Sequence, residues 1–115
     1  MQEGNVYRNG IFVGMISKDD DGTYRFLYDQ AYLQSEQPFA VSVNLPLQVE
    51  AFLSDELFAF FYNMLAEGTT KALQCQSLRI DEDDHFTRLL KTTELNTIGS
   101  VTVQEVTDNR QEEQL

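Results

Sequence analysis

The stretch from Leu57 to Gly68 constrains the fold most, because it gathers large apolar and aromatic side chains and then ends in polar residues and a glycine. In a helix these side chains form two adjacent apolar faces, one of Phe58, Phe61 and Leu65 and the other of Leu57, Phe60 and Met64. A small domain has difficulty covering both faces. We therefore expect a helix that either lies inside the core or keeps part of its surface for a partner.

The chain has 115 residues, which predicts one domain over residues 1–115. A chain of this length buries roughly 65% of its unfolded surface on folding. Because 42% of the residues are hydrophobic, with 8 Phe and 5 Tyr, the composition is that of a folded protein. The polar end, residues 107–115, is predicted to be a flexible tail.

The formal net charge is −11, from 19 acidic and 8 basic residues. This balance argues against direct binding to nucleic acid, where Lys and Arg contacts to phosphate supply much of the affinity. It argues equally against anionic membrane surfaces. Two interpretations remain: the acidity serves solubility, or it attracts a partner with a basic surface.

A single cysteine, Cys75, excludes an internal disulfide and favours a reducing, cytoplasmic location. No His or Asp lies close to it in sequence, so we expect a buried or idle thiol. We expect no signal peptide from the polar and acidic start of the chain. No apolar run approaches the ~20 residues that would span a bilayer.

The first part of the chain predicts an antiparallel meander of three strands. Val6–Ile16 forms two strands around Asn9-Gly10, a pair that tolerates the positive φ angles of a two-residue hairpin turn. Asp19–Gly22 is the next turn. In Thr23–Tyr28 the aromatic residues alternate with other residues, which predicts a third strand.

The middle of the chain predicts a short helical turn, a strand and the aromatic helix. Asp29–Gln37 is expected to hold a turn or one helical turn, and Phe39–Asn44 a strand that ends before Pro46. We expect 48–53 to be a connector. Ser54 is the expected N-cap of the aromatic helix and Gly68 its C-cap.

Two further helices and one strand are predicted towards the end. The helices cover Thr69–Leu78 and Asp84–Leu90, the second capped by Asp81 or Asp83 and burying Phe86, Leu89 and Leu90. Ile98–Val106 is predicted to return to the sheet. The expected fold class is therefore α+β, a small antiparallel sheet packed with two to three helices.

The sequence offers few candidates for chemistry. His85 is the only histidine, and we expect it to be a surface residue near a helix start. The acidic clusters Asp19–Asp21 and Asp81–Asp84 do not fit the calcium-binding loop of an EF-hand, which needs a Glu six residues after its central Gly. After Gly22 of the first cluster that position is Tyr28. We predict no catalytic, cofactor-binding or metal-binding residue. The residues alone thus indicate an acidic module that binds another protein.

Several segments, in order, resemble the N-terminal region of HipA-type toxin kinases. The opening Val6-Tyr7-x-Asn9-Gly10-x-x-Val13-Gly14 is similar to the start of that family. Further similarities are Tyr24-x-Phe26-x-Tyr28-Asp29-x-x-Tyr32-Leu33, Ser42-x-x-Leu45-Pro46-Leu47, Phe60-Phe61-x-Asn63-x-Leu65-x-Glu67-Gly68, Asp83-Asp84-x-Phe86-x-x-Leu89-Leu90 and Gly99-Ser100-Val101. Together they span about residues 5 to 106, with Ala66 where the family usually has Pro.

The resemblance implies a role as well as a fold. The chain stops where a HipA protein would continue into its catalytic lobe. In this it is similar to HipS, the separate antitoxin of three-component HipBST systems. By this resemblance the expected partner is a HipT-like Ser/Thr kinase toxin, which the chain inhibits in trans. A HipB-like DNA-binding protein is expected in a ternary complex. The alternative is a structural subunit that completes the kinase fold without inhibiting it.

The aromatic segment is the expected contact with the kinase, acting by occupying or distorting its nucleotide cleft. The predicted partner-binding residues are Phe61, Tyr62, Asn63, Met64, Leu65 and Glu67. Core packing is the competing interpretation of the same residues. It is the favoured one for Phe61, whereas for Tyr62 and Met64 the two interpretations are balanced.

Overall fold

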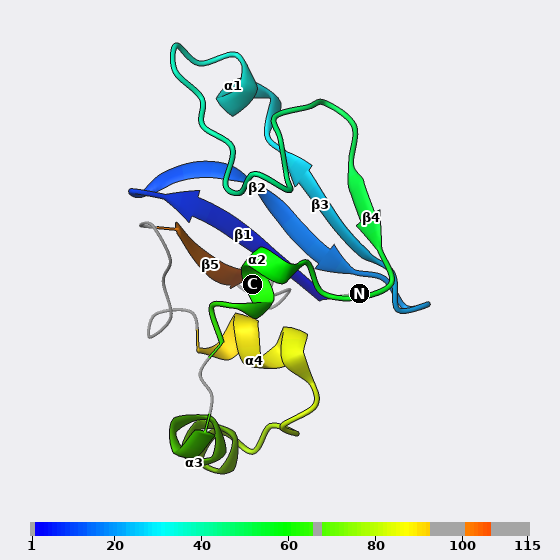
Figure 1. The fold of residues 1–115 in the computed structure, drawn as a ribbon, viewed down its shortest axis with the longest axis vertical. Helices are drawn as coiled ribbons and strands as arrows, with labels where there is room; N and C mark the ends of the chain where they lie inside the picture. The colour runs from blue at the N-terminus through cyan, green and yellow to red at the C-terminus, as the bar shows by residue number, and fades with distance from the viewer. Residues whose placement is uncertain (1, 66–67, 93–100, 107–115) are drawn as a thin grey trace, which may run out of the picture.

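The computed structural model describes residues 2–65, 68–92 and 101–106 of the chain. The described residues form an α+β fold built on one antiparallel sheet of five strands in the order β4-β3-β2-β1-β5 (Figure 1), which confirms the predicted class. The strands are β1 (Gln2–Arg8), β2 (Ile11–Lys18), β3 (Tyr24–Tyr28), β4 (Phe52–Ser54) and β5 (Val101–Val106). The helices are α1 (Gln30–Leu33), α2 (Ala59–Tyr62), α3 (Gly68–Leu78) and α4 (His85–Lys91).

The predicted meander is confirmed. Asn9 (φ 53°) and Gly10 (φ 79°) both take the left-handed conformation that a two-residue hairpin turn requires between β1 and β2. Between β2 and β3, the amide of Gly22 donates to the carbonyl of Asp19 at 2.9 Å, and Gly22 has φ 91°. A bulge between Val6 and Tyr7 shifts the register of the first hairpin.

The returning strand is also confirmed, because β5 pairs antiparallel with β1. The start of the predicted strand, residues 98–100, and the predicted tail, residues 107–115, lie outside the described residues. Since β5 pairs with β1 and not with β4, the strand that is last in sequence closes the side of the sheet opposite to β4.

The predicted strand Phe39–Asn44 is wrong. This segment lies in a long loop, residues 34–51, in which an isolated bridge joins Ser42 and Leu45. Its backbone is bonded by side chains instead of a neighbouring strand. The buried hydroxyl of Tyr28 donates to the carbonyl of Leu45 and accepts from the amide of Val41 at 3.0 Å. The strand in this region is β4, which lies partly within the predicted connector 48–53 and pairs with β3.

The aromatic helix is shorter than predicted, and both predicted caps are wrong. Ser54 pairs with Tyr24 at the end of β4, so its backbone already belongs to the sheet, and the N-cap of α2 is Phe58. Gly68 begins α3 with φ 64° and does not end α2. The second and third helices occur as predicted, although Asp84, and neither Asp81 nor Asp83, caps α4.

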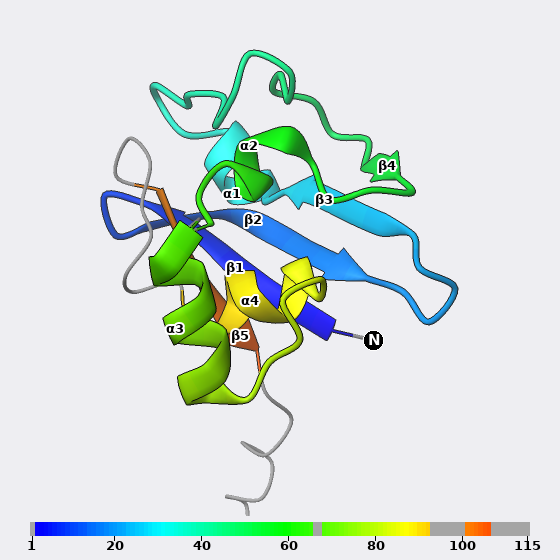
Figure 2. The same cartoon turned by 60° about the horizontal axis from the view of Figure 1, so that its bottom comes forward.

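The core lies on one face of the sheet. Figures 1 and 2 show α2, α3 and α4 on this face, with α3 farthest from the strands. Phe26 of β3 lies at the centre, its ring 5.7 Å from that of Phe61 in α2 and 4.8 Å from that of Tyr28. From α4, Phe86, Leu89 and Leu90 are buried as predicted. Helices α2 and α4 also contact each other, so packing on this face brings the start of α4 beside α2.

Candidate protein-binding site

The α2 turn divides the predicted partner-binding residues between core and surface. Its hydrogen bonds continue beyond the helix as i→i−3 bonds, from Met64 to Phe61 and from Leu65 to Tyr62, both at 3.1 Å. Such a tight turn points neighbouring side chains in different directions. Successive residues of one apolar run therefore end in different environments.

The structure places three of the six predicted residues in the core. Phe61, Met64 and Leu65 are 0%, 4% and 7% exposed. Tyr62 is 42% exposed and Asn63 is exposed as well. Glu67 lies outside the described residues. The exposed part of the predicted set is thus Tyr62 and Asn63, and the buried part supports them from beneath.

Tyr62 lines a hollow between α2 and α4, which we call the Tyr62 pocket. Its lining includes Tyr24, Asp55, Glu56, Leu57, Tyr62 and His85. The rings of Tyr62 and His85 meet edge to face with their centres 5.0 Å apart. An exposed aromatic ring beside two carboxylates offers an apolar contact and acceptors for basic groups, which is typical of a protein-binding surface.

Tyr62 is the one described lining residue of this pocket that was predicted to bind a partner, and the ionisable residues Asp55, Glu56 and His85 were not. From the sequence, His85 is predicted to be a surface residue near a helix start, and Asp55 and Glu56 are given no binding role. The sequence holds no signal for their proximity to Tyr62, because they come from the β4–α2 connection and from α4. Only the packing of α4 against α2 brings His85, 23 positions later, to the tyrosine ring.

The surroundings of His85 favour its neutral form. Its pKa is lowered from the usual value mainly by burial, and then by the nearby charges of Arg88 and Lys71, while Asp83 and Asp84 oppose the shift. The Nη1 of Arg88 lies 3.1 Å from Nδ1 of His85. A guanidinium can only donate, so Nδ1 accepts and the proton of the neutral ring is on Nε2.

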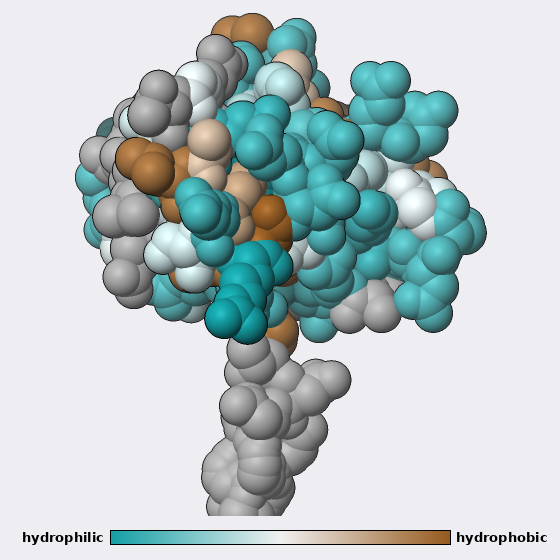
Figure 3. Space-filling view, turned by 90° about the horizontal axis from the view of Figure 1, so that it is seen from below, coloured by the Kyte–Doolittle hydropathy of each residue, from teal (hydrophilic) through white to brown (hydrophobic). Residues whose placement is uncertain are grey.

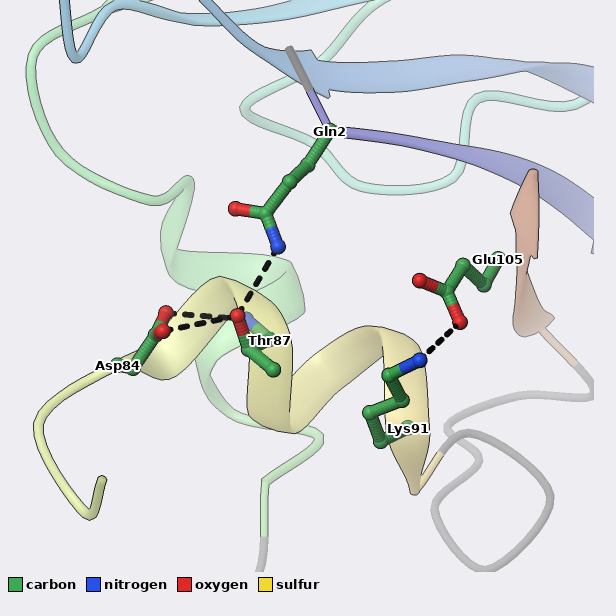
Figure 4. A network of polar contacts seen from close by, with 5 residues as sticks. All are labelled: Gln2, Asp84, Thr87, Lys91 and Glu105. Atoms are coloured by element: carbon green, nitrogen blue, oxygen red, sulfur yellow. Dashed lines mark hydrogen bonds and ion pairs between the residues drawn. The ribbon is translucent and has the colours of Figure 1, made fainter. Parts of the chain in front are cut away.

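Polar contacts fix α4 in this position (Figure 4). The Asp84 carboxylate accepts from the amide of Thr87 at 3.2 Å and from its hydroxyl at 2.8 Å, which caps the helix. The same hydroxyl accepts from Nε2 of Gln2 at 3.0 Å. At the other end, Nζ of Lys91 lies 2.7 Å from the Glu105 carboxylate. These bonds tie both ends of α4 to β1 and β5 and so set the place of His85.

The described residues show no arrangement for metal binding. Over residues 2–65, 68–92 and 101–106, no group of three or more His, Cys, Asp or Glu side chains could hold a metal ion. Cys75 is buried, as predicted. Of the helices in these same ranges, none combines the length and apolar character needed to cross a membrane.

Comparison with known proteins agrees with the fold. The family of the HipA N-terminal domain matches residues 4–104. The chain belongs to this family. A solved structure, the N-terminal domain of HipA toxin, is 30% identical in sequence and superposes with a TM-score of 0.69. The match covers 94% of this chain and 95% of that one.

Two relatives differ in how much of their length the family occupies. An uncharacterized protein of Haemophilus influenzae is 34% identical over 105 residues, a match that covers 91% of this chain and 93% of the relative. A protein of Sinorhizobium fredii named "Putative kinase Y4mE" is 31% identical over 85 residues, which cover 74% of this chain but 20% of the relative.

Proposed function

We propose that this chain is an antitoxin that binds a HipT-like Ser/Thr kinase toxin in trans, in the cytoplasm, and inhibits it without catalysis of its own. The observation that supports this proposal is the contrast between the two relatives. In the S. fredii protein the matched region is a fifth of the chain, whereas in the H. influenzae protein it is nearly the whole chain. The family therefore occurs both joined to a longer protein and nearly alone.

The Tyr62 pocket is the proposed contact with the kinase. Tyr62 supplies a large exposed ring, and Asn63 lies beside it. Phe61, Met64 and Leu65 hold this turn from the core, and Glu67 completes the predicted set. Exposed aromatic side chains backed by a rigid core often anchor protein interfaces, because little conformational entropy is lost on binding. Inhibition follows if the bound turn occupies or distorts the nucleotide cleft.

A third protein completes the proposed complex. We propose a HipB-like DNA-binding protein as the component that contacts DNA, since a net charge of −11 on this chain opposes direct contact with phosphate. The chain would then reach DNA only through its partners.

The decisive experiment looks for a HipT-like kinase gene beside the gene of this protein and uses the purified product of that gene. We expect the two purified proteins to form a complex and kinase autophosphorylation to stop at saturating antitoxin. Unchanged autophosphorylation together with a higher kinase melting temperature would instead identify a structural subunit. Absence of both effects, or of any neighbouring kinase gene, would contradict the proposed partner.

A substitution tests the contact surface. Tyr62→Ala is expected to weaken kinase binding by roughly 1–4 kcal/mol, the range for a buried interface anchor. Leu73→Ala is the matched control, because Leu73 is a similarly exposed apolar residue, at 60%, on α3. Titration calorimetry measures both, and circular dichroism checks folding. Equal affinities for the parent and Tyr62→Ala would place the contact elsewhere.

A further inference from the structure

The face of the sheet opposite the core carries a second apolar hollow, which we call the outer groove. Side chains alternate between the two faces of a strand, so in β3 the residues between the buried aromatics point away from the core. Leu27 of β3 and its register partner Met15 of β2 both lie on this side. The groove is lined by Phe12, Met15, Leu27, Leu33 and Val49, with Asp29 at its rim.

The outer groove continues into a neighbouring hollow. The two share Phe12 and Asp29, and the lining of the second also includes Ile11, Phe39 and the cation Arg8. Leu53 of β4, 61% exposed, lies on the same side of the sheet and pairs with Arg25. The apolar surface thus extends from the first hairpin to the β4 edge.

Helices α2, α3 and α4 leave this surface uncovered, since all three lie on the core face (Figure 2). Helix α1 contributes Leu33 to the lining of the groove. Leu27 is 42% exposed and Val49 is 61% exposed. The α3 side is different in character, since Figure 3 shows hydrophilic residues over most of it and hydrophobic ones in small groups. A contiguous apolar hollow at a sheet face is the kind of surface that a partner protein covers.

The charge around this surface indicates the chemistry of the partner. Asp29 lines the groove and Glu50 follows Val49 in the chain. Residues 26–65, which supply most of its lining, contain five carboxylates, two of them at the Tyr62 pocket, and neither Lys nor Arg. The same 40 positions hold seven of the ten large apolar side chains that are exposed among the described residues. The nearest cations are already engaged: Arg8 lies 4.5 Å over the Phe39 ring, and Arg25 is 3.7 Å from Asp19.

We propose that the outer groove is a second docking surface for the kinase, and that it takes a segment with apolar side chains flanked by Lys or Arg. This inference rests on the proposed function. The β4 edge connects the two surfaces, because Leu53 lies on the outer face of the sheet while Asp55 and Glu56, two and three residues later, line the Tyr62 pocket. A partner that passes around this three-residue edge strand reaches both. A second copy of the chain fits poorly, since each copy carries −11.

The test introduces a charge into the groove. In Leu27→Asp and Val49→Asp, a carboxylate would have to be buried on docking, which is costly without a partner charge. We expect each variant to bind the neighbouring kinase at least about tenfold more weakly than the parent. Leu73→Asp on α3 is the matched control and should bind within about twofold of the parent. Val49 lies in the exposed loop, so its variant serves even if Leu27→Asp fails to fold.

A second measurement tests the charge complementarity. Glu50→Lys beside the groove should weaken binding and reduce its dependence on salt, since a favourable opposite-charge pair is lost. Glu82→Lys, exposed near α4, should not. Parent-like affinity in both Asp variants would overturn the groove while leaving the kinase partnership intact. Failure of the parent itself to bind would overturn both. A parent that dimerises in sedimentation, when Val49→Asp does not, would assign the groove to a second copy.

Discussion

The two faces of the sheet have the same strands but opposite surroundings. On the core face Ile16, Phe26 and Phe61 are fully buried, whereas on the outer face Leu27 and Leu53 are 42% and 61% exposed. An antiparallel sheet requires only one covered face to be stable. The difference indicates that the stability of the fold depends on the core face. The apolar residues of the outer face are therefore available to bind a partner.

The largest expected effect is a cavity on the core face. Phe61→Ala removes a fully buried ring that packs against Phe26, and should lower the free energy of unfolding by about 3–5 kcal/mol. Leu53→Ala on the outer face should change it by about 0.5 kcal/mol or less. Urea denaturation measures both. Similar losses for the two variants would show that the outer face also carries stability.

Two glycines sharpen the comparison within the sheet. A Cβ added at Gly14 would lie 2.3 Å from the carbonyl oxygen of Leu27 and 3.0 Å from Cα of Tyr28, so β2 and β3 would have to separate. A Cβ at Gly4 would meet side-chain atoms of Leu90 and Val103 at 2.7 and 2.8 Å, and side chains yield more easily than backbone. We expect Gly14→Ala to destabilise by about 3 kcal/mol or more and Gly4→Ala by about 1–3 kcal/mol. Thermal or urea unfolding measures both variants. A larger loss of unfolding free energy in Gly4→Ala than in Gly14→Ala would contradict this prediction.

The long loop over the core gives a smaller effect. Tyr28→Phe removes the hydroxyl that bonds the backbone of Val41 and Leu45, and should cost about 1–3 kcal/mol because both groups are left without it. Burial also raises the pKa of Tyr28, so the hydroxyl keeps its proton. Tyr7→Phe on the outer face is the control, with an expected change of about 0.5 kcal/mol or less. Hydrogen exchange at the Val41 amide should rise only in the first variant, and equal protection in both would contradict the role of the hydroxyl.

The parts predicted correctly from sequence are those specified by local chemistry. Asn9-Gly10 determines the first hairpin, and the alternation of Tyr24, Phe26 and Tyr28 identifies β3 and its buried face. The error at Phe39–Asn44 has a nonlocal cause, because that apolar run is held by hydroxyls of tyrosines from earlier in the chain.

The candidate site divides in the same way. The apolar pattern identified the Phe61–Leu65 turn as important and favoured the core for Phe61. It left Tyr62 and Met64 balanced, because helical periodicity does not foresee the i→i−3 bonds that tighten the turn after Tyr62. His85 beside Tyr62 was beyond sequence reasoning, because their contact depends on how α4 packs. The outer groove was equally hidden, since it joins residues of β2, β3, α1 and the long loop.

The smallest expected effect concerns the single histidine at the margin of the core face. Because its pKa is lowered in the folded state, His85 binds a proton less readily there than in the unfolded chain. Its contribution to stability is therefore fully present above the unfolded pKa of about 6.5 and is lost as the pH falls through the folded pKa. One His in the chain makes its Hε1 resonance unambiguous, and NMR titration should give a midpoint below 6.5.

Substitutions of two lysines test the cause of that shift. Lys71→Ala should raise the His85 midpoint slightly, because the charge of Lys71 disfavours the protonated ring. Lys91→Ala should leave the midpoint unchanged, since Lys91 is paired with Glu105 and does not contribute to the shift.

If protonation of His85 disturbs its contact with Tyr62, kinase binding should weaken over the same pH range in the parent but not in His85→Gln. A parent midpoint at or above the usual value would mean that the His85 ring is open to solvent and does not pack against Tyr62.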